Sequence, residues 1–179
     1  MATYLAFLRA VNLGATRKFP KTAITAATEA AGGVDVATYI NSGNVRLTSP
    51  LRSAAKVEAA LEAAYLEHAG FDVPTVVFTA AEFAALAAEA REIAAANPDA
   101  ERHYVYLLKA PAATDRITGL LARQTPAAGI EVRGRAVHLL LAPGRKQGVV
   151  DPYGAEKALG VVATNRNRTV IDALAGMWC

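Results

Sequence analysis

The hydrophobic and polar positions of the first 78 residues alternate between short apolar runs and helical stripes. The run Tyr4–Leu8 is typical of a buried strand, and Val57, Leu61 and Tyr65 share one face of a helix. Asn41-Ser42-Gly43-Asn44, between two apolar runs, is typical of a hairpin turn. The expected elements are a strand at 4–9, a helix at 20–31, strands at 36–40 and 45–48, a helix at 53–69 and a strand at 75–78. This β-α-β-β-α-β order predicts a ferredoxin-like unit.

The second half repeats this order after a linker helix. Thr79-Ala-Ala-Glu82 is a capping-box pattern that predicts a helix start, and Asn97-Pro98-Asp99 predicts a break. Tyr104–Ala110 then echoes Tyr4–Ala10. The later elements are expected at 112–123 (helix), 130–133 and 136–141 (strands), 153–159 (helix), 161–162 (a brief strand) and from 170 (helix). We predict an α+β fold of two ferredoxin-like units in tandem, residues 1–96 and 97–179, with a linker helix and an added C-terminal helix.

Composition narrows the classes of function. The chain has 179 residues, a hydrophobic share of 53%, a net charge of +3 and a pI of about 9.1. This excess of positive charge is smaller than that of a dedicated DNA-binding domain. Cys179 is the single cysteine, so no intramolecular disulfide forms, and we expect a reducing, cytoplasmic compartment. No apolar run approaches the roughly 20 residues that a membrane-spanning helix needs, so we expect no membrane partner.

Two polar segments follow expected strands and converge on one end of the first sheet. The first and second strands of a β-α-β-β-α-β unit run parallel, so the loop after the first strand and the turn after the second emerge together. The first helix also begins there, and its amides and positive dipole favour an anion. The candidate ligand-binding residues in this region are Arg9, Asn12, Gly14, Lys18, Ser42, Gly43 and Asn44. The alternative is that the asparagines and glycines only shape the turn and the loop.

A third polar cluster, Ala163–Thr169, precedes an apolar helical stripe near the C-terminus. Asn165 or Asn167 is a suitable N-cap for that helix. Arg166 and Arg168 lie at the helix start, where a cation is disfavoured unless an anion or a carboxylate accompanies it. Arg166 and Asn167 therefore join the candidate ligand-binding residues, with a salt bridge to an acidic side chain as the alternative explanation.

No recognisable catalytic or metal-binding set accompanies these clusters. The histidines His68, His103 and His138 lie far apart in the sequence, without the spacing of metal ligands, and His68 falls on an apolar stripe. The chain has no Walker loop, dinucleotide fingerprint or nucleophile elbow, so we expect no cofactor. Whether the protein is an enzyme stays open at this point.

Three segments carry a resemblance to a known family. They are Leu8–Gly14, Thr38–Val45 and Leu159–Asn167. In order and spacing they resemble a large bacterial family described as domain of unknown function 1697. The resemblance implies a duplicated ferredoxin-like α+β architecture and no established activity. The implied signature positions are Arg9, Asn12, Gly14, Ser42, Gly43, Asn44, Thr164, Arg166 and Asn167. The chain departs from the family pattern at Ala10, where glycine is usual, and at Arg168, where an aromatic residue is usual.

The leading hypothesis is a binding module for an anionic ligand: a nucleotide, a phosphorylated metabolite or a nucleic-acid backbone. Arg9 and Lys18 would hold the charge, and Asn12, Ser42 and Asn44 would supply directional hydrogen bonds. One alternative is an enzyme whose acid–base residues come from distant segments. Another is a homo-oligomeric interaction module that pairs through sheet edges or through its apolar C-terminal tail.

Overall fold

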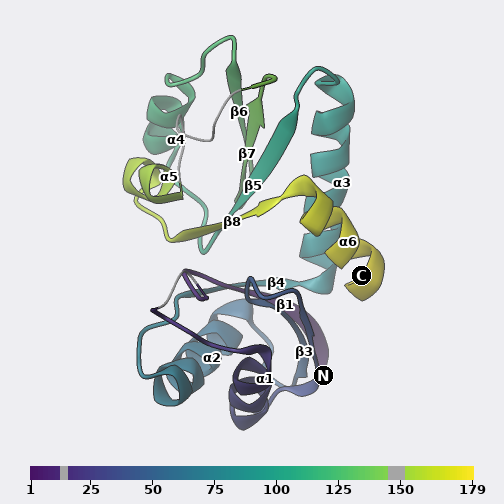
Figure 1. The fold of residues 1–179 in the computed structure, drawn as a ribbon, viewed down its shortest axis with the longest axis vertical. Coiled ribbons are helices and arrows are strands. Elements are labelled where there is room, and N and C mark those ends of the chain that lie inside the picture. The colour runs from purple at the N-terminus through teal and green to yellow at the C-terminus, as the bar shows by residue number, and fades with distance from the viewer. Residues whose placement is uncertain (13–15, 145–151) are drawn as a thin grey trace. The chain divides into compact units, whose positions relative to one another are not determined.

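The computed structural model describes residues 1–12, 16–144 and 152–179, and Figure 1 shows their path. Contacts divide the chain into two compact units, residues 1–83 with 178–179 and residues 84–177. Each unit holds one four-stranded antiparallel sheet. The elements are β1 (Ala2–Leu8), α1 (Lys21–Ala30), β2 (Val34–Tyr39), β3 (Asn44–Ser49), α2 (Ala54–Ala69), β4 (Thr75–Thr79), α3 (Ala80–Ala96), β5 (Arg102–Leu108), α4 (Thr114–Leu121), β6 (Ala128–Arg133), β7 (Ala136–Leu141), α5 (Pro152–Leu159), β8 (Ala163–Asn167) and α6 (Arg168–Trp178).

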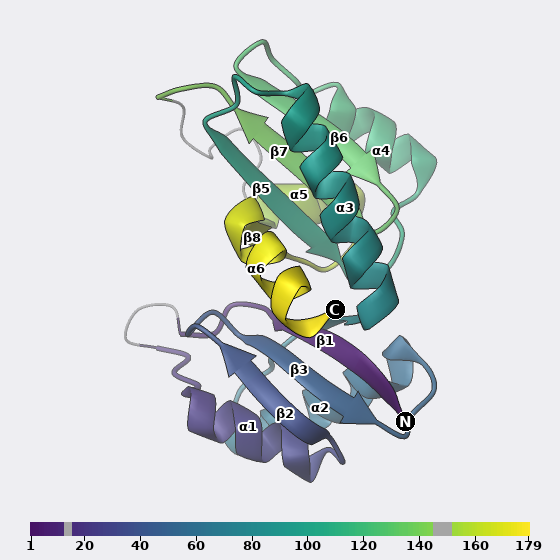
Figure 2. The ribbon, with the colours of Figure 1, turned by 90° about the vertical axis from the view of Figure 1, so that its right-hand side faces the viewer.

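In unit 1 the strand order is β2-β3-β1-β4, and helices α1 and α2 cover one face of the sheet (Figure 2). The alternation along β1 sends Tyr4, Ala6 and Leu8 to that face, where they pack with Leu61 and Tyr65 of α2. The helix α2 begins at its N-cap Ser53, and Gly70 ends it in the left-handed conformation. The core of unit 1 therefore lies between this helical layer and the sheet.

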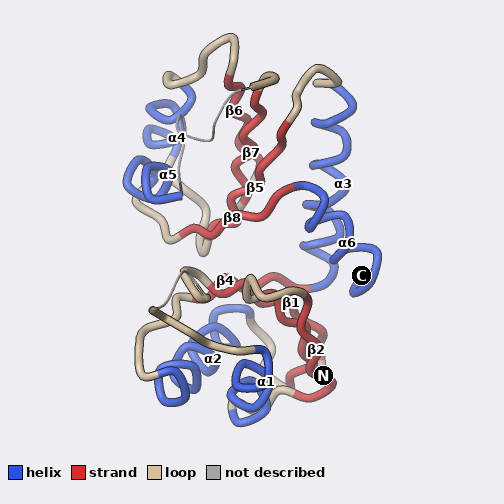
Figure 3. The backbone as a smooth tube through the Cα atoms, viewed as in Figure 1, coloured by secondary structure: helices blue, strands red, loops and turns tan. Residues whose placement is uncertain are grey.

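In unit 2 the order β6-β7-β5-β8 repeats that of unit 1. Figure 3 shows the four strands of unit 2 in red. Tyr106 and Leu108 of β5 pack with Leu120 of α4 and with Leu159 of α5 in one core. The residues between them on β5 face the other side of the sheet. Helices α3 and α6 lie on that second side (Figure 1).

Backbone hydrogen bonds at the ends of the strands also repeat between the units. The amide of Leu8 donates to Gly43 O at 2.8 Å, and the amide of Leu108 donates to Arg135 O at 2.9 Å. The next amide in each unit, that of Arg9 or Lys109, donates to the loop before the edge strand at 2.9 Å. The sequence echo between Tyr4–Ala10 and Tyr104–Ala110 thus has a counterpart in hydrogen bonding.

Glutamate carboxylates on the helices accept hydrogen bonds from the outward-facing backbone amides of two edge strands, β4 and β8. Glu62 and Glu58 of α2 accept from the amides of Thr75 and Val77 at 2.8 and 3.0 Å. In unit 2, Glu156 of α5 accepts from the amide of Ala163 at 2.7 Å. These amides point away from the neighbouring strand, and a buried amide without a partner costs about 1–3 kcal/mol.

The α+β fold and the order of its elements are confirmed, with one error near the C-terminus. The last strand is not at 161–162 but spans Ala163–Asn167, within the cluster expected to be a loop. The pattern of apolar residues does not reveal this strand, because its buried residues Thr164 and Arg166 are not apolar. None of the helices among the described residues is long and apolar enough to cross a membrane.

Candidate functional site

Asn12 joins the loop after β1 to the hairpin turn between β2 and β3. Its amide nitrogen Nδ2 donates to Phe19 O and to Asn41 O, both at 2.9 Å, and its Oδ1 accepts from the amide of Phe19 at 2.9 Å. The two polar segments of unit 1 therefore lie together, as topology predicts. Three hydrogen bonds from one side chain fix the loop, so Asn12 has a structural role here.

The turn itself is held by Asn44 and packed by Gly43. Asn44 is fully buried, and its Nδ2 donates to Tyr39 O at 3.1 Å and to Ser42 Oγ at 2.9 Å. Gly43 has a φ of +72°, and a Cβ at this position would lie 2.7 Å from Leu8 Cβ. Only glycine suits both the left-handed conformation and the close approach of β1.

Four non-glycine residues around this junction adopt the left-handed conformation. Their φ angles are +55° at Ala10, +57° at Asn12, +56° at Arg17 and +46° at Ile40. Arg17 holds the loop by donating from Nε to Ala10 O at 2.7 Å and from Nη2 to Asp72 O at 2.6 Å. Such residues cost about 1 kcal/mol each, and strained backbone of this kind concentrates at functional sites.

Replacing Ala10 by glycine is expected to stabilise the protein by about 0.5–1 kcal/mol, because glycine adopts a φ of +55° without steric cost. Urea unfolding of Ala10→Gly measures the gain. The control is Ala122→Gly, at a φ of −62°, which should lose stability. A loss at both positions would contradict the strain at Ala10.

The structure gives the position and exposure of two of the other three predicted site residues of unit 1. Lys18 is exposed, two residues before Pro20, which precedes α1 without a side-chain cap. Arg9 directly follows β1 and is half-buried. Gly14 lies outside the described residues. The structure thus brings Asn12, Ser42, Gly43 and Asn44 together, and a ligand-binding role for this loop cluster stays a prediction.

Arg166 and Asn167 belong to unit 2, at the end of β8. Arg166 is buried, which lowers the pKa of its guanidinium to about 10, and its Nη1 donates to Thr164 Oγ1 at 2.9 Å and to Asn165 O at 2.6 Å. Asn167 Oδ1 accepts from the amide of Val170 at 2.9 Å and therefore caps α6. Of the two proposed N-caps, Asn167 is the correct one.

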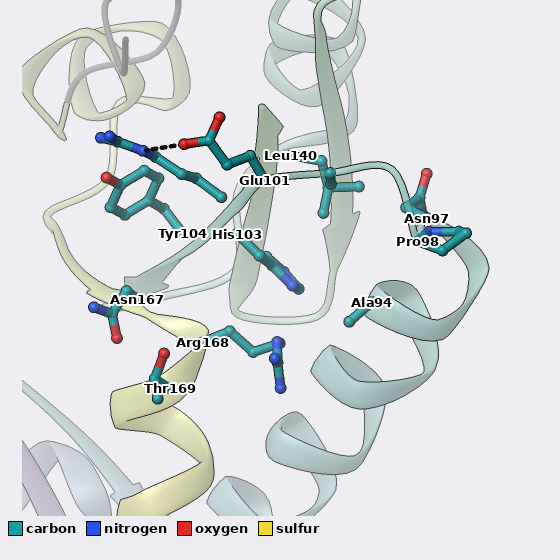
Figure 4. Close-up of a pocket in the computed structure, with 12 residues that line it drawn as sticks. Ala94, Asn97, Pro98, Glu101, His103, Tyr104, Leu140, Asn167, Arg168 and Thr169 are labelled. Atoms are coloured by element: carbon teal, nitrogen blue, oxygen red, sulfur yellow. Dashed lines mark ion pairs between the residues drawn. The ribbon is translucent and has the colours of Figure 1, made fainter. Parts of the chain in front are cut away.

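A cavity of about 430 Å³ opens at this helix start, and we name it the α6 pocket (Figure 4). It lies between the end of α3, the start of β5 and the first residues of α6. Its polar lining comes from Asn97, Glu101, Arg102, His103, Tyr104, Asn167, Arg168 and Thr169. Ala94, Pro98, Ala100 and Leu140 complete the lining.

Positive charge outweighs negative charge in the α6 pocket. Arg168 forms an ion pair with Asp172 one turn further along α6, and Arg91 approaches the same carboxylate at 3.3 Å. Arg102 Nε lies 3.7 Å from Glu101 Oε1, and both residues line the pocket. The ion pair of Arg168 with Asp172 is the salt bridge that the sequence predicts as the alternative to a bound anion. Because Asp172 is shared by two arginines, it does not neutralise both.

A pair of buried histidines borders the α6 pocket, and sequence reasoning missed it. His103 Nε2 and His138 Nδ1 lie 2.9 Å apart and share one hydrogen bond. Burial lowers the pKa of His103 to about 4, assisted by the charge of Arg168, and burial lowers that of His138 to about 3, assisted by His103. Both rings are therefore neutral at pH 7. The third histidine, His68, is exposed on α2 rather than in the core.

The strand repeat was the signal that could have found this pair. In unit 1, β1 pairs with β3 so that Leu5 lies opposite Arg46. The same pairing in unit 2 sets Val105 opposite His138, beside His103 on one face of the sheet. Among the described residues, no group of three or more histidine, cysteine or acidic side chains is arranged to hold a metal ion.

Comparison with known proteins relates this fold to a bacterial one. No curated protein matches the sequence. The structure of the conserved bacterial protein SP0830 from Streptococcus pneumoniae is similar, with a TM-score of 0.77 at 18% identity over 99% of each chain. At this identity the likeness concerns the fold alone. The model of a protein family of unknown function, DUF1697, matches residues 1–138. The chain therefore belongs to the DUF1697 family.

Proposed function

We propose that this protein binds a small anionic ligand, of the phosphate- or carboxylate-bearing metabolite class, in the α6 pocket. The observation that carries the proposal is the opening of a helix N-terminus into a cavity lined by Arg102 and Arg168. The first amides of a helix have no partner within it, and the helix dipole favours negative charge beside them. A cavity of about 430 Å³ suits a small molecule.

The side chains in the α6 pocket suit an anion better than those of the loop cluster do. The polar atoms of Asn12 and Asn44 already bond backbone or side-chain groups within their own loops. The guanidinium groups of Arg102 and Arg168 have five N–H donors each. Their ion pairs with Glu101 and Asp172 use only some of these donors. Such groups bind phosphate or carboxylate oxygens through two parallel hydrogen bonds.

We also infer that the two units are ferredoxin-like and arose by duplication. This is supported by the sheet orders β2-β3-β1-β4 and β6-β7-β5-β8, and by the paired hydrogen bonds at Leu8 and Leu108. The carboxylates of Glu62 on α2 and Glu156 on α5 accept from the first amides of the corresponding edge strands and add a third repeated feature. The single cysteine keeps the cytoplasm as our expected compartment.

Inorganic phosphate is expected to raise the melting temperature of the protein and to bind measurably in calorimetry, because a ligand of the folded state stabilises it. Arg168→Ala should weaken phosphate binding about tenfold or more, the effect of losing charge-assisted hydrogen bonds of about 1.5–3 kcal/mol. Arg168→Lys keeps the charge and should lose less.

The matched control is Arg123→Ala, which removes an exposed arginine of the same unit that does not line the α6 pocket. The phosphate affinity of this variant should stay within about twofold of the wild type, because dissolved salt screens surface charges that lie away from the site. Equal losses in Arg123→Ala and Arg168→Ala would show general charge attraction and would refute a site at the α6 pocket.

A further inference from the structure

Each ring of the histidine pair has a second nitrogen that takes no part in the hydrogen bond between the two rings. His103 Nδ1 and His138 Nε2 are buried and have no hydrogen-bond partner in the described part of the chain. His103 is 9% exposed and His138 is fully buried. Leaving a buried polar atom without a partner is energetically costly, so each such atom in a folded protein calls for an explanation.

The two rings hold different positions relative to the α6 pocket. His103 lines the pocket and extends from β5 toward Ala94 and Arg168, whereas His138 is not part of the lining (Figure 4). The contact with His138 occupies Nε2 of His103. The nitrogen of His103 that this contact leaves without a partner in the described part of the chain is therefore Nδ1.

The charge of Arg168 favours one of the two tautomers of His103. A neutral imidazole has one N–H and one lone pair, and a nearby cation is stabilised by the lone pair. Arg168 lines the same pocket as His103, and the His103 ring extends toward it (Figure 4). With the lone pair on Nδ1, His103 donates from Nε2 to His138 Nδ1, and the pocket gains a hydrogen-bond acceptor beside its arginines.

We propose that the α6 pocket selects an oxyanion that still carries a proton, of the hydrogen-phosphate class, whose hydroxyl donates to His103 Nδ1. This inference rests on the proposed function and adds the class of ligand to it. Arg102 and Arg168 bind the unprotonated oxygens. His138 is a positioning residue, because it holds His103 in the tautomer that accepts.

Phosphate and sulfate are the probes that test this. They have similar size and shape, but sulfate has no hydroxyl at neutral pH and phosphate has at least one. At pH 6.5 and constant ionic strength, calorimetry should give an affinity about tenfold higher for phosphate, the effect of one hydrogen bond of about 1.4 kcal/mol. In ¹⁵N NMR of the wild-type protein, the unprotonated Nδ1 of His103 should shift with phosphate and not with sulfate.

Two variants test whether His103 is the residue that accepts the hydrogen bond from the phosphate hydroxyl. His103→Phe should bind phosphate and sulfate equally. Glu101→Gln removes the carboxylate that lines the pocket, whose Oε2 accepts from the amide of Gly144 at 2.7 Å, and should keep the preference for phosphate. If His103→Phe does not fold, His138→Asn and the NMR shift of the wild-type protein give the same decision, since His138→Asn should reduce the preference.

The outcomes separate this inference from the proposed function. Equal binding of both anions by the wild type would overturn the inference and leave an anion site standing. A preference that persists in His103→Phe, or one that disappears in Glu101→Gln, would overturn it as well. Binding of neither anion would overturn the proposed function, and the inference with it.

Discussion

Lowering the pH from 7 to 5 is expected to reduce the free energy of unfolding by about 4 kcal/mol, because the histidine pair is neutral in the folded protein. The pKa values of His103 and His138 are about 4 and about 3 when folded, against 6.5 when unfolded. Below pH 6.5 the unfolded chain therefore binds protons that the folded chain does not. Stability is fully present above pH 6.5 and is lost as the pH falls toward these folded-state values.

The charges around the pair set this direction. Arg168 and Arg133 oppose protonation of the pair, while Asp172 and Glu131 favour protonation of His103 less strongly than burial opposes it. Urea unfolding at pH 7, 6 and 5 measures the slope. The double variant His103→Gln/His138→Gln should flatten it whatever its absolute stability.

The exposed histidine provides the control for this experiment. His68 lies on the surface of α2 and not in the buried pair, so His68→Gln keeps the contribution of the pair to the slope. A wild-type stability that stays constant between pH 7 and pH 5 would show that the pair takes up protons as readily in the folded protein as in the unfolded chain, so that burial does not lower its pKa values.

Gly43→Ala is expected to destabilise the protein by about 3 kcal/mol or more. Two costs combine: the left-handed φ of +72° costs an L-residue roughly 1–2 kcal/mol, and overpacking costs about 1–3 kcal/mol. The new Cβ would lie 2.7 Å from Leu8 Cβ and 3.0 Å from Val11 Cγ2. The Cβ of Leu8 is anchored in β1 and has no rotamer that avoids the contact.

Gly70→Ala separates the two costs. Gly70 has nearly the same φ, +73°, but nothing lies within 4 Å of a Cβ built there. Its loss in urea unfolding should be about 1 kcal/mol, the backbone cost alone. Similar losses at Gly43 and Gly70 would mean that β1 moves away without cost, against the close packing described for the turn.

Most of the fold could be predicted because its signals are local. Pro20, Ser53 and Gly70 mark helix ends through backbone chemistry that tertiary contacts rarely override, and the hairpin turn at residues 41–44 has the glycine that its geometry requires. Topology then brought the two polar segments together, because parallel strands end on the same side of a sheet.

The α6 pocket was harder to find because its residues come from three elements. Asn167 was a candidate from its place at a helix start, and Arg168 was noticed only as an electrostatic mismatch. His103 and His138 are 35 residues apart, and only the pairing of β5 with β7 makes them neighbours. The strand β8 was missed for a related reason, since Arg166 is a buried charged residue and hydrophobic patterns do not detect those.

The carboxylates on the edge strands limit how this protein can polymerise. An open sheet edge is a template for another chain, but Glu58 and Glu62 occupy outward amides of β4, and Glu156 does so on β8. Strand addition is thereby directed to β2 or β6. On β2 the register shift between Val34 and Ala37 interrupts the ladder. Unit 1 thus resists fibre-like growth from both sides without using a proline on either edge.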